Sequence, residues 1–257
     1  MKGFFSSLSS CFTFLSTIPL GASSDGIEDA MRHVYLFPVC AAVIGFLAGG
    51  VGYVASYLSF HPVIVALFTF TALYSLTGIN HLDGLADLGD GMVTHGDSRR
   101  KIAAMKDLAV GTGGVGLLVF GLIATYTAIL SIAYISPLGL FSALVVGEVC
   151  SKHAMLTVSL RARAVHDGMG SLTIRHTTPA RYLTSLAITL VICTTLCEFP
   201  AGGVGALIVS TLAVLLLREE AKRHFGGISG DVIGASNEVA RIAALVTLSG
   251  VLSWMHS

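Results

Sequence analysis

The sequence has few charged residues and lacks any disulfide or zinc pattern. Only 12% of its 257 residues are charged, against about 25% in a typical soluble domain, and the formal net charge is zero. No basic stretch with interleaved aromatic residues occurs, so nothing indicates a nucleic-acid partner. The five cysteines form no C-x-x-C pair, and most lie in apolar runs as small hydrophobic residues. No internal repeat or matched pair of glycine-broken runs is visible, which argues against a transporter.

What the sequence has instead is long apolar runs. Hydrophobic residues make up 54% of the chain, and the mean hydropathy is +0.81. This predicts an all-α polytopic bundle that spans the lipid bilayer as a single integral membrane domain over residues 1–257. Seven runs approach the roughly 20 residues that cross a bilayer. They cover residues 34–60, 62–79, 113–134, 137–157, 182–198, 201–217 and 240–255. Three breaks are short and contain proline, so proline should begin the second helix of each tight hairpin.

The positively charged residues all fall on one side of the membrane in this predicted arrangement of spans. All 15 Lys and Arg residues lie before the first run, in the three long connections or in the adjoining helix ends. By the positive-inside rule the long connections and the N-terminus are cytoplasmic. We therefore expect a multi-pass protein of the cytoplasmic (inner) cell membrane with its active site facing the cytoplasm. Its expected cytoplasmic parts include an interfacial segment at 1–33, an active-site loop at 80–112 and a further loop at 218–239.

Three aspartates in the stretch Asn-His-Leu-Asp-Gly-Leu-Ala-Asp-Leu-Gly-Asp-Gly at 80–91 are the main candidates for chemistry. In a helix, about 100° of rotation per residue places Asp83, Asp87 and Asp90 within an arc of roughly 60°. Such carboxylates repel one another unless a cation lies among them, and oxygen ligands suit Mg²⁺. We expect a Mg²⁺ site here in preference to a solvated acidic surface. Asp90 is the preferred general base, and His81 could orient a carboxylate or transfer protons.

Three further segments offer contacts for a phosphorylated substrate. A glycine-rich turn at the start of the third run has free N–H groups that suit a phosphate. A polar cluster before the last run lies among small residues, although helix capping by Ser236 and a flexible link is the alternative. Between them, Arg161 or Arg163 could bind a diphosphate, although anchoring to lipid headgroups explains these arginines equally well. The candidates are Lys106, Asp107, Gly111, Thr112, Gly113, Arg163, Asp231, Asn237 and Glu238.

One charged pair lies inside an apolar run. Glu148 and Lys152 stand four residues apart in the run at 137–157. Exposure of either to lipid would be costly, so we expect them to pair and to face the bundle or the cytoplasmic cavity.

Three motifs and the N-terminal region resemble one known family. The motifs are His-Leu-Asp-Gly-Leu-Ala-Asp-Leu-Gly-Asp-Gly at 81–91, Met-Lys-Asp-Leu-Ala-Val-Gly-Thr-Gly-Gly at 105–114 and Gly-Asp-Val-Ile-Gly-Ala at 230–235. In order and spacing they are similar to the signatures of the cobalamin synthase (adenosylcobinamide-GDP ribazoletransferase) family, which residues 14–20 also resemble. The run at 163–170 lacks the proline that the family usually has there.

The resemblance implies a Mg²⁺-dependent phosphotransferase of the membrane. Such an enzyme joins adenosylcobinamide-GDP to α-ribazole, or to its 5′-phosphate, and releases GMP in the final assembly step of adenosylcobalamin (vitamin B12) biosynthesis. By the same resemblance the three aspartates would serve as metal and catalytic carboxylates. The residues expected near the nucleotide and the corrinoid are Lys106, Asp107, Thr112 and Asp231.

Two other functions stay open. The aspartate spacing also resembles the D-x-x-D-G-x-x-A-R core of CDP-alcohol phosphotransferases, which make phospholipids, but Asp87 follows Ala86 where that motif has Arg. A cation or metabolite transporter could use the aspartates as an ion site, but transporters place such residues near the membrane midplane. Small-residue faces permit a homo-oligomer without requiring one.

Overall fold

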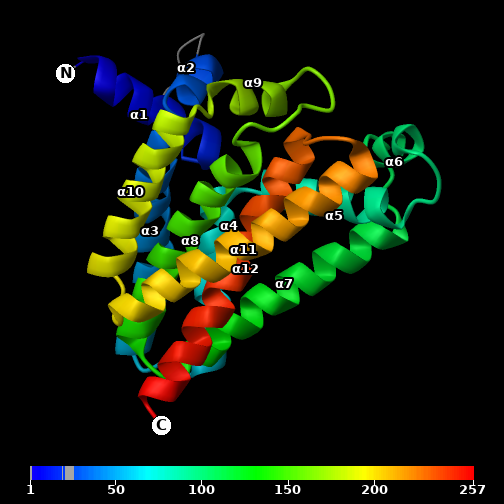
Figure 1. Ribbon diagram of the computed structural model, residues 1–257. Helices are drawn as coiled ribbons and strands as arrows, with labels where there is room; N and C mark the ends of the chain where they lie inside the picture. The colour runs from blue at the N-terminus through cyan, green and yellow to red at the C-terminus, as the bar shows by residue number, and fades with distance from the viewer. Residues whose placement is uncertain (1, 19, 21–25) are drawn as a thin grey trace.

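The computed structural model describes residues 2–18, 20 and 26–257, and it shows long helices bundled together with shorter helices across one end (Figure 1). The long helices are α3 (Phe37–Tyr57), α4 (Pro62–Thr77), α7 (Thr112–Ala133), α8 (Pro137–Ser159), α10 (Pro179–Thr195), α11 (Pro200–Phe225) and α12 (Gly230–Met255). The shorter helices are α1 (Lys2–Leu15), α2 (Gly26–Arg32), η1 (Val34–Leu36), α5 (Asn80–Val93), α6 (Ser98–Met105) and α9 (Met169–His176). We call the end formed by α1, α2, α5, α6 and α9 the head of the bundle.

The all-α prediction is confirmed. In the described ranges the only sheet-like pairing is a parallel bridge between Ala164 and Ile228. Proline begins the helix after each tight break, as predicted, because α4, α8 and α11 start at Pro62, Pro137 and Pro200. Proline suits the first turn since its missing N–H would have no intrahelical partner there.

Each of the seven apolar runs lies in a helix, but seven membrane crossings are not confirmed. By length and apolar composition, five helical segments could cross a membrane: η1 with α3, α7, α8, α11 and α12. Helices α4 and α10 have 16 and 17 residues, fewer than the roughly 20 of a typical span. Together α4 and α5 could form a sixth span, but they meet at 90°. Between them Gly78 adopts a φ of 70°, which a residue with a side chain rarely adopts.

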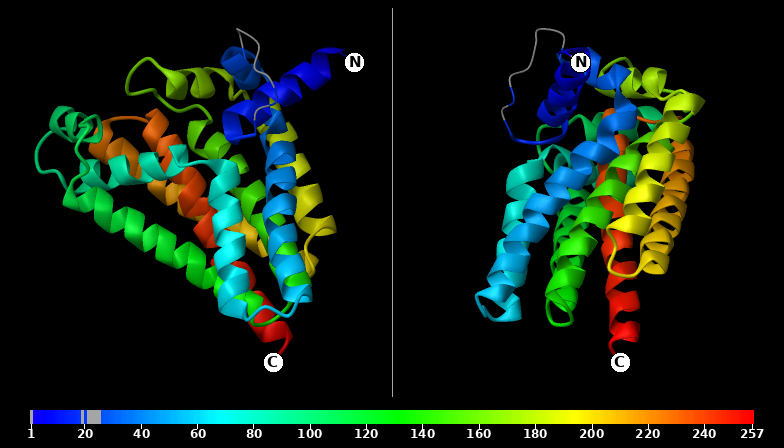
Figure 2. Two further views of the ribbon diagram at one scale, coloured as in Figure 1. Left: turned by 180° about the vertical axis from the view of Figure 1, so that it is seen from behind. Right: turned by 90° about the vertical axis from the view of Figure 1, so that its left-hand side faces the viewer.

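Helix α8 lies at the centre of the bundle and is buried along almost its whole length. Helices α3, α10, α11 and α12 pack around it (Figure 2). Glycines make the closest of these approaches possible. A Cβ atom added to Gly45 of α3 would lie 2.6 Å from the carbonyl oxygen of Leu144 in α8. Small residues at such crossings allow the two backbones to touch.

The prediction of a loop at residues 218–239 is wrong. Helix α11 continues to Phe225 and α12 begins at Gly230, so only residues 226–229 connect them. The polar residues extend α11 because they pair along its surface, as Lys222 does with Glu219 at 2.6 Å.

Local chain geometry fixes both helix ends at this connection. Gly226 ends α11 with a φ of 75°, in the left-handed region. Ser229, rather than Ser236, caps α12, since its hydroxyl accepts a hydrogen bond from the N–H of Val232 at 3.3 Å. The first turn of α12 therefore starts at the head and not within the bundle.

The segment 80–112, predicted as a loop, folds mostly as α5 and α6, and α5 runs across the head nearly perpendicular to α4 (Figure 2). Helices α1 and α2 lie in the segment predicted to be interfacial, of which residues 1, 19 and 21–25 are outside the described ranges. The two ends of the chain lie at opposite ends of the bundle (Figure 1). Which side of the membrane each end faces stays a prediction.

Candidate active site

The acidic helix α5 packs against the first turns of α12 and α7. Glycines in α5 make both contacts. A Cβ atom added to Gly84 would lie 2.7 Å from the carbonyl oxygen of Asp231, and one added to Gly89 would lie 2.5 Å from that of Gly113. A larger residue at either position would push the helices apart, so these glycines bring Asp231 beside the aspartates of α5.

The three aspartates of α5 lie in different surroundings. Asp83 is exposed, Asp87 is half-buried and Asp90 is buried. Helix α5 lies outside the five candidate spans. Burial and, to a smaller extent, the negative charges of Asp231, Asp83 and Asp90 together raise the pKa of Asp87 to about 7. A cation bound here would reduce the electrostatic repulsion between the carboxylates of α5 and α12.

Asp90 binds the backbone of the neighbouring helix. Its Oδ2 accepts a hydrogen bond from the N–H of Gly111 at 2.7 Å, and its Oδ1 accepts one from the N–H of Gly114 at 2.8 Å. These amides belong to the start of α7, where the helix has no carbonyl partners for them. Asp90 therefore caps α7 and complements the positive end of its dipole. This geometry favours a structural role for Asp90 over the general-base role, and it occupies amides that were expected to bind phosphate.

No group of three or more His, Cys, Asp or Glu side chains is arranged to hold a metal ion in the part of the chain that the structure describes. The expected trio does not converge because Asp90 is turned toward α7. Asp231 is the carboxylate whose negative charge acts most strongly on Asp87. Sequence reasoning placed Asp231 among the substrate contacts, since nothing in a one-dimensional pattern shows that α12 starts against α5.

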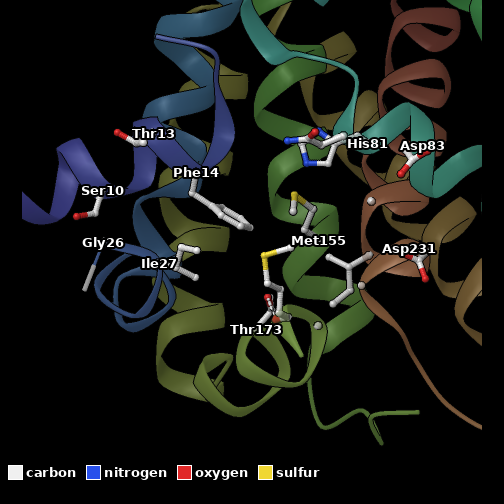
Figure 3. A pocket seen from close by; sticks show the side chains of 16 residues that line it. Ser10, Thr13, Phe14, Gly26, Ile27, His81, Asp83, Met155, Thr173 and Asp231 are labelled. Carbon is white, nitrogen blue, oxygen red and sulfur yellow. Dashed lines mark hydrogen bonds between the residues drawn. The ribbon is translucent and has the colours of Figure 1, made fainter. Parts of the chain in front are cut away.

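A cavity of about 580 Å³ lies at the head beside these carboxylates (Figure 3). Its walls come from α1, α2, α5, α8, α9 and α12. Asp83 and Asp231 lie at one end, and Phe14 and Ile27 lie at the other (Figure 3). Its volume is within the range of roughly 300–1,000 Å³ that is typical of small-molecule sites. The cavity therefore combines an acidic end with an apolar end.

His81 forms part of the cavity wall. Its side chain is buried, and its Nδ1 has no hydrogen-bond partner among the described residues. Burial and, to a smaller extent, the positive charges of Lys152 and Arg241 together lower the pKa of His81 to about 3. The imidazole is therefore neutral at pH 7 and can offer a ligand a hydrogen bond, but it is a poor proton donor.

A buried ion network joins α4, α8 and α12. Glu148 accepts a hydrogen bond from Lys152 at 2.7 Å, which confirms the predicted pairing, and it also pairs with Arg241. Arg241 pairs in turn with Glu238, to which the hydroxyl of Tyr74 donates at 3.0 Å. Two carboxylates and two cations balance one another, as burial inside a membrane bundle requires.

The other predicted substrate contacts lie elsewhere. Glu238 belongs to the ion network, and Asn237 donates to it at 2.9 Å, so neither lines the cavity. Lys106 lines a second, very small cavity of about 10 Å³ together with Asp231 and His166. Residues outside the lining of both cavities are Asp107, Gly111, Thr112, Gly113 and Arg163.

Sequence reasoning missed most of the apolar side of the cavity. Ile27, Met155 and Met169 line it from α2, α8 and α9. Apolar residues at helical spacing look like ordinary core positions, so no pattern distinguishes them. Phe14 alone had a signal, because it falls within the N-terminal run that resembles the family.

The fold and the cavity define a multi-pass membrane protein with a cavity of small-molecule size, acidic at one end, at the head of its helix bundle. The family model described as cobalamin-5-phosphate synthase matches residues 7–249, and the chain belongs to that family. The resemblance noted from the motifs is thereby confirmed.

Three archaeal relatives carry the name adenosylcobinamide-GDP ribazoletransferase. The chain is 38% identical to the one from Methanocella arvoryzae, with 97% of each chain covered. It is 37% identical to that of Methanococcoides burtonii, over 100% of this chain and 96% of the relative. The relative from Methanosarcina barkeri is 34% identical over 98% of this chain and 94% of its own. No solved structure gives a significant match.

Proposed function

We propose that the protein transfers the adenosylcobinamide-phosphate group from adenosylcobinamide-GDP to α-ribazole, or to its 5′-phosphate, and releases GMP. The observation that carries this proposal is the similarity to ribazoletransferases along the whole chain. The acidic end of the cavity supplies a place for the reaction, since Asp83 and Asp231 face the same space.

Mg²⁺ is the cofactor that fits these side chains. Their donors are carboxylate oxygens, which suit a hard cation, and Mg²⁺ is usually held by one or two carboxylates together with substrate phosphates and water. A preformed cage of three carboxylates is therefore not needed. Asp83 and Asp231 would hold the ion. When bound, it supplies positive charge to the diphosphate from which GMP departs.

The carboxylate of Asp87 is the candidate general base. Its pKa of about 7 suits proton transfer near neutral pH, and it is close enough to Asp83 and Asp231 for their charges to raise that pKa. In the transfer, the acceptor's ribose oxygen attacks the phosphorus attached to cobinamide, and the bond from that phosphorus to the GMP oxygen breaks. The hydroxyl proton passes to Asp87. This role replaces the one expected for Asp90, whose oxygens are bound to α7.

The membrane placement of the head is also a proposal. The Lys and Arg residues of the connections indicate that the head faces the cytoplasm of a cell-membrane protein. The test is labelling of the exposed head residue Asp107 as D107C with a membrane-impermeant maleimide. Labelling in inverted vesicles but not in intact cells is expected, and the reverse pattern would place the head outside.

Purified protein in lipid nanodiscs tests the activity directly. With Mg²⁺, adenosylcobinamide-GDP and α-ribazole it should release GMP, and folded protein that releases none would remove the proposal. D83N and D231N should each lower turnover by at least about 100-fold, the scale of a lost electrostatic contribution in an active site. E219Q, a change at an exposed carboxylate on α11, serves as the matched control. Near-normal rates in D83N and D231N would contradict the metal assignment.

A further inference from the structure

The end of the cavity away from the carboxylates has a different chemistry. Phe14 of α1 and Ile27 of α2 lie there, and Met155 of α8 lies between them and the acidic end (Figure 3). Met169 of α9 adds a second flexible thioether to the lining. Aromatic, branched and thioether side chains together form a surface that packs well on a flat apolar ring.

Three hydroxyl side chains line the cavity, Ser10, Thr13 and Thr173, and the two threonines already donate within their own helices. Thr13 donates its hydroxyl hydrogen to the carbonyl oxygen of Ser9 at 3.0 Å, within α1. Thr173 donates to the carbonyl oxygen of Met169 at 3.0 Å, within α9. These side chains therefore have no donor left for the polar edge of a base. A ligand group with several donors and acceptors would therefore lose most of its hydrogen bonds to water without replacement, since Ser10 supplies a single hydroxyl.

The size of the cavity separates the two substrates of the proposed reaction. A space of about 580 Å³ is suited to one nucleoside-sized molecule. The donor carries a corrin macrocycle and a guanine nucleotide, and it exceeds this space several-fold. We infer that the cavity is the acceptor site, with the ribose of α-ribazole toward Asp83 and Asp231 and its dimethylbenzimidazole base against Phe14 and Ile27. This inference rests on the proposed function.

The chemistry of the two bases supports this assignment. Dimethylbenzimidazole is flat, carries two methyl groups and has one ring nitrogen free for hydrogen bonding, so an apolar pocket accepts it at little cost. Guanine carries an N–H, an amino group and a carbonyl oxygen on one edge, and a site that binds it must supply partners. The donor nucleotide therefore belongs outside the apolar end. His81, with its unpartnered Nδ1, is placed to form a hydrogen bond with a ribose hydroxyl.

This placement gives α1 and α2 a function in substrate selection. They supply Phe14 and Ile27, whereas the acidic end is supplied by α5 and α12. Changes in the apolar end should therefore alter acceptor binding and leave the transfer step intact. That separation between KM and kcat is the basis of the test.

The test uses full-length protein in nanodiscs with Mg²⁺, and it measures the KM of each substrate in variants of the apolar end. F14L and I27A should each raise the KM for α-ribazole about 3- to 10-fold, the scale of one lost aromatic or aliphatic contact. The KM for adenosylcobinamide-GDP and kcat should stay within about twofold. F5A is the matched control, since Phe5 lies on α1 but does not line the cavity.

A second readout detects the polarity of the apolar end. The parent protein should have a lower KM for α-ribazole than for the analogue whose base is adenine. I27N should reduce the ratio of these two KM values at least threefold. An unchanged acceptor KM in both F14L and I27A overturns the assignment. So does an effect confined to the donor KM or to inhibition by GMP, which would place the guanine base here.

Failure of the proposed function gives a different result. If the parent protein releases no GMP, direct calorimetric titration of α-ribazole still decides the inference. Binding that weakens in F14L and I27A but not in F5A supports an acceptor site, and absence of binding refutes it.

Discussion

Replacing Asp90 by Asn tests whether this carboxylate is a structural cap or part of the metal site. In the structure its two oxygens accept hydrogen bonds from Gly111 and Gly114 at 2.7 and 2.8 Å. Asparagine has one acceptor oxygen, so one amide of α7 loses its partner and faces an NH₂ group. A hydrogen bond to a charged group contributes about 1.5–3 kcal/mol. The interaction with the helix dipole adds about 0.3–1 kcal/mol, for a total of about 2–4 kcal/mol.

The assay is thermal unfolding in detergent, followed by circular dichroism at the helix band. A domain of this size loses about 2–4 °C of unfolding temperature per kcal/mol, so the unfolding temperature of D90N should fall by about 4–16 °C. D87N is the matched control, since it makes the same change on the same helix three residues earlier and breaks no bond to α7. Its unfolding temperature should not fall.

The activity of D90N completes the test. Below its unfolding temperature it should need the same Mg²⁺ concentration for half-maximal GMP release as the parent protein. An unchanged unfolding temperature together with a tenfold higher Mg²⁺ requirement would refute the structural role and return Asp90 to the metal site.

Three further predictions concern charge and packing. Because the pKa of Asp87 is raised in the folded state, that state holds more protons than the unfolded state between about pH 4 and 7, and its stability falls as pH rises. Without divalent cations, D87N should therefore have a higher unfolding temperature than the parent at pH 8. At pH 3 the two unfolding temperatures should be the same. G84A should lower turnover and cost about 1–3 kcal/mol of unfolding free energy, because its Cβ would meet the backbone of Asp231, whereas G250A has open space and should be neutral or stabilising. R241M leaves the buried Glu238 without a cation and Glu148 with Lys152 alone, so it should cost about 3–5 kcal/mol in chemical unfolding, a loss that near-parent stability would contradict.

The architecture was largely predictable because a bilayer imposes strong local rules. Three features could be interpreted from neighbouring residues alone: the apolar runs, the prolines that begin helices (Pro62, Pro137 and Pro200) and the four-residue spacing of Glu148 and Lys152. The rules failed at 218–239, because residues with high helix propensity and pairing charges extend a helix beyond its apolar part. They also gave seven spans where length supports five or six, since the bend after α4 depends on one glycine and on packing.

The candidate site was only partly predictable. The sequence by itself determined that the protein is a helical membrane protein, that Asp83 and Asp87 are near one another, and which family its motifs match, because each depends on spacing along the chain. The tertiary structure decided that Asp90 caps α7, that Asp231 approaches α5, and that α1 and α2 close an apolar end of the cavity. These contacts join segments that are far apart in sequence. Which segments come into contact is determined by how the helices pack, and spacing along the chain does not show this.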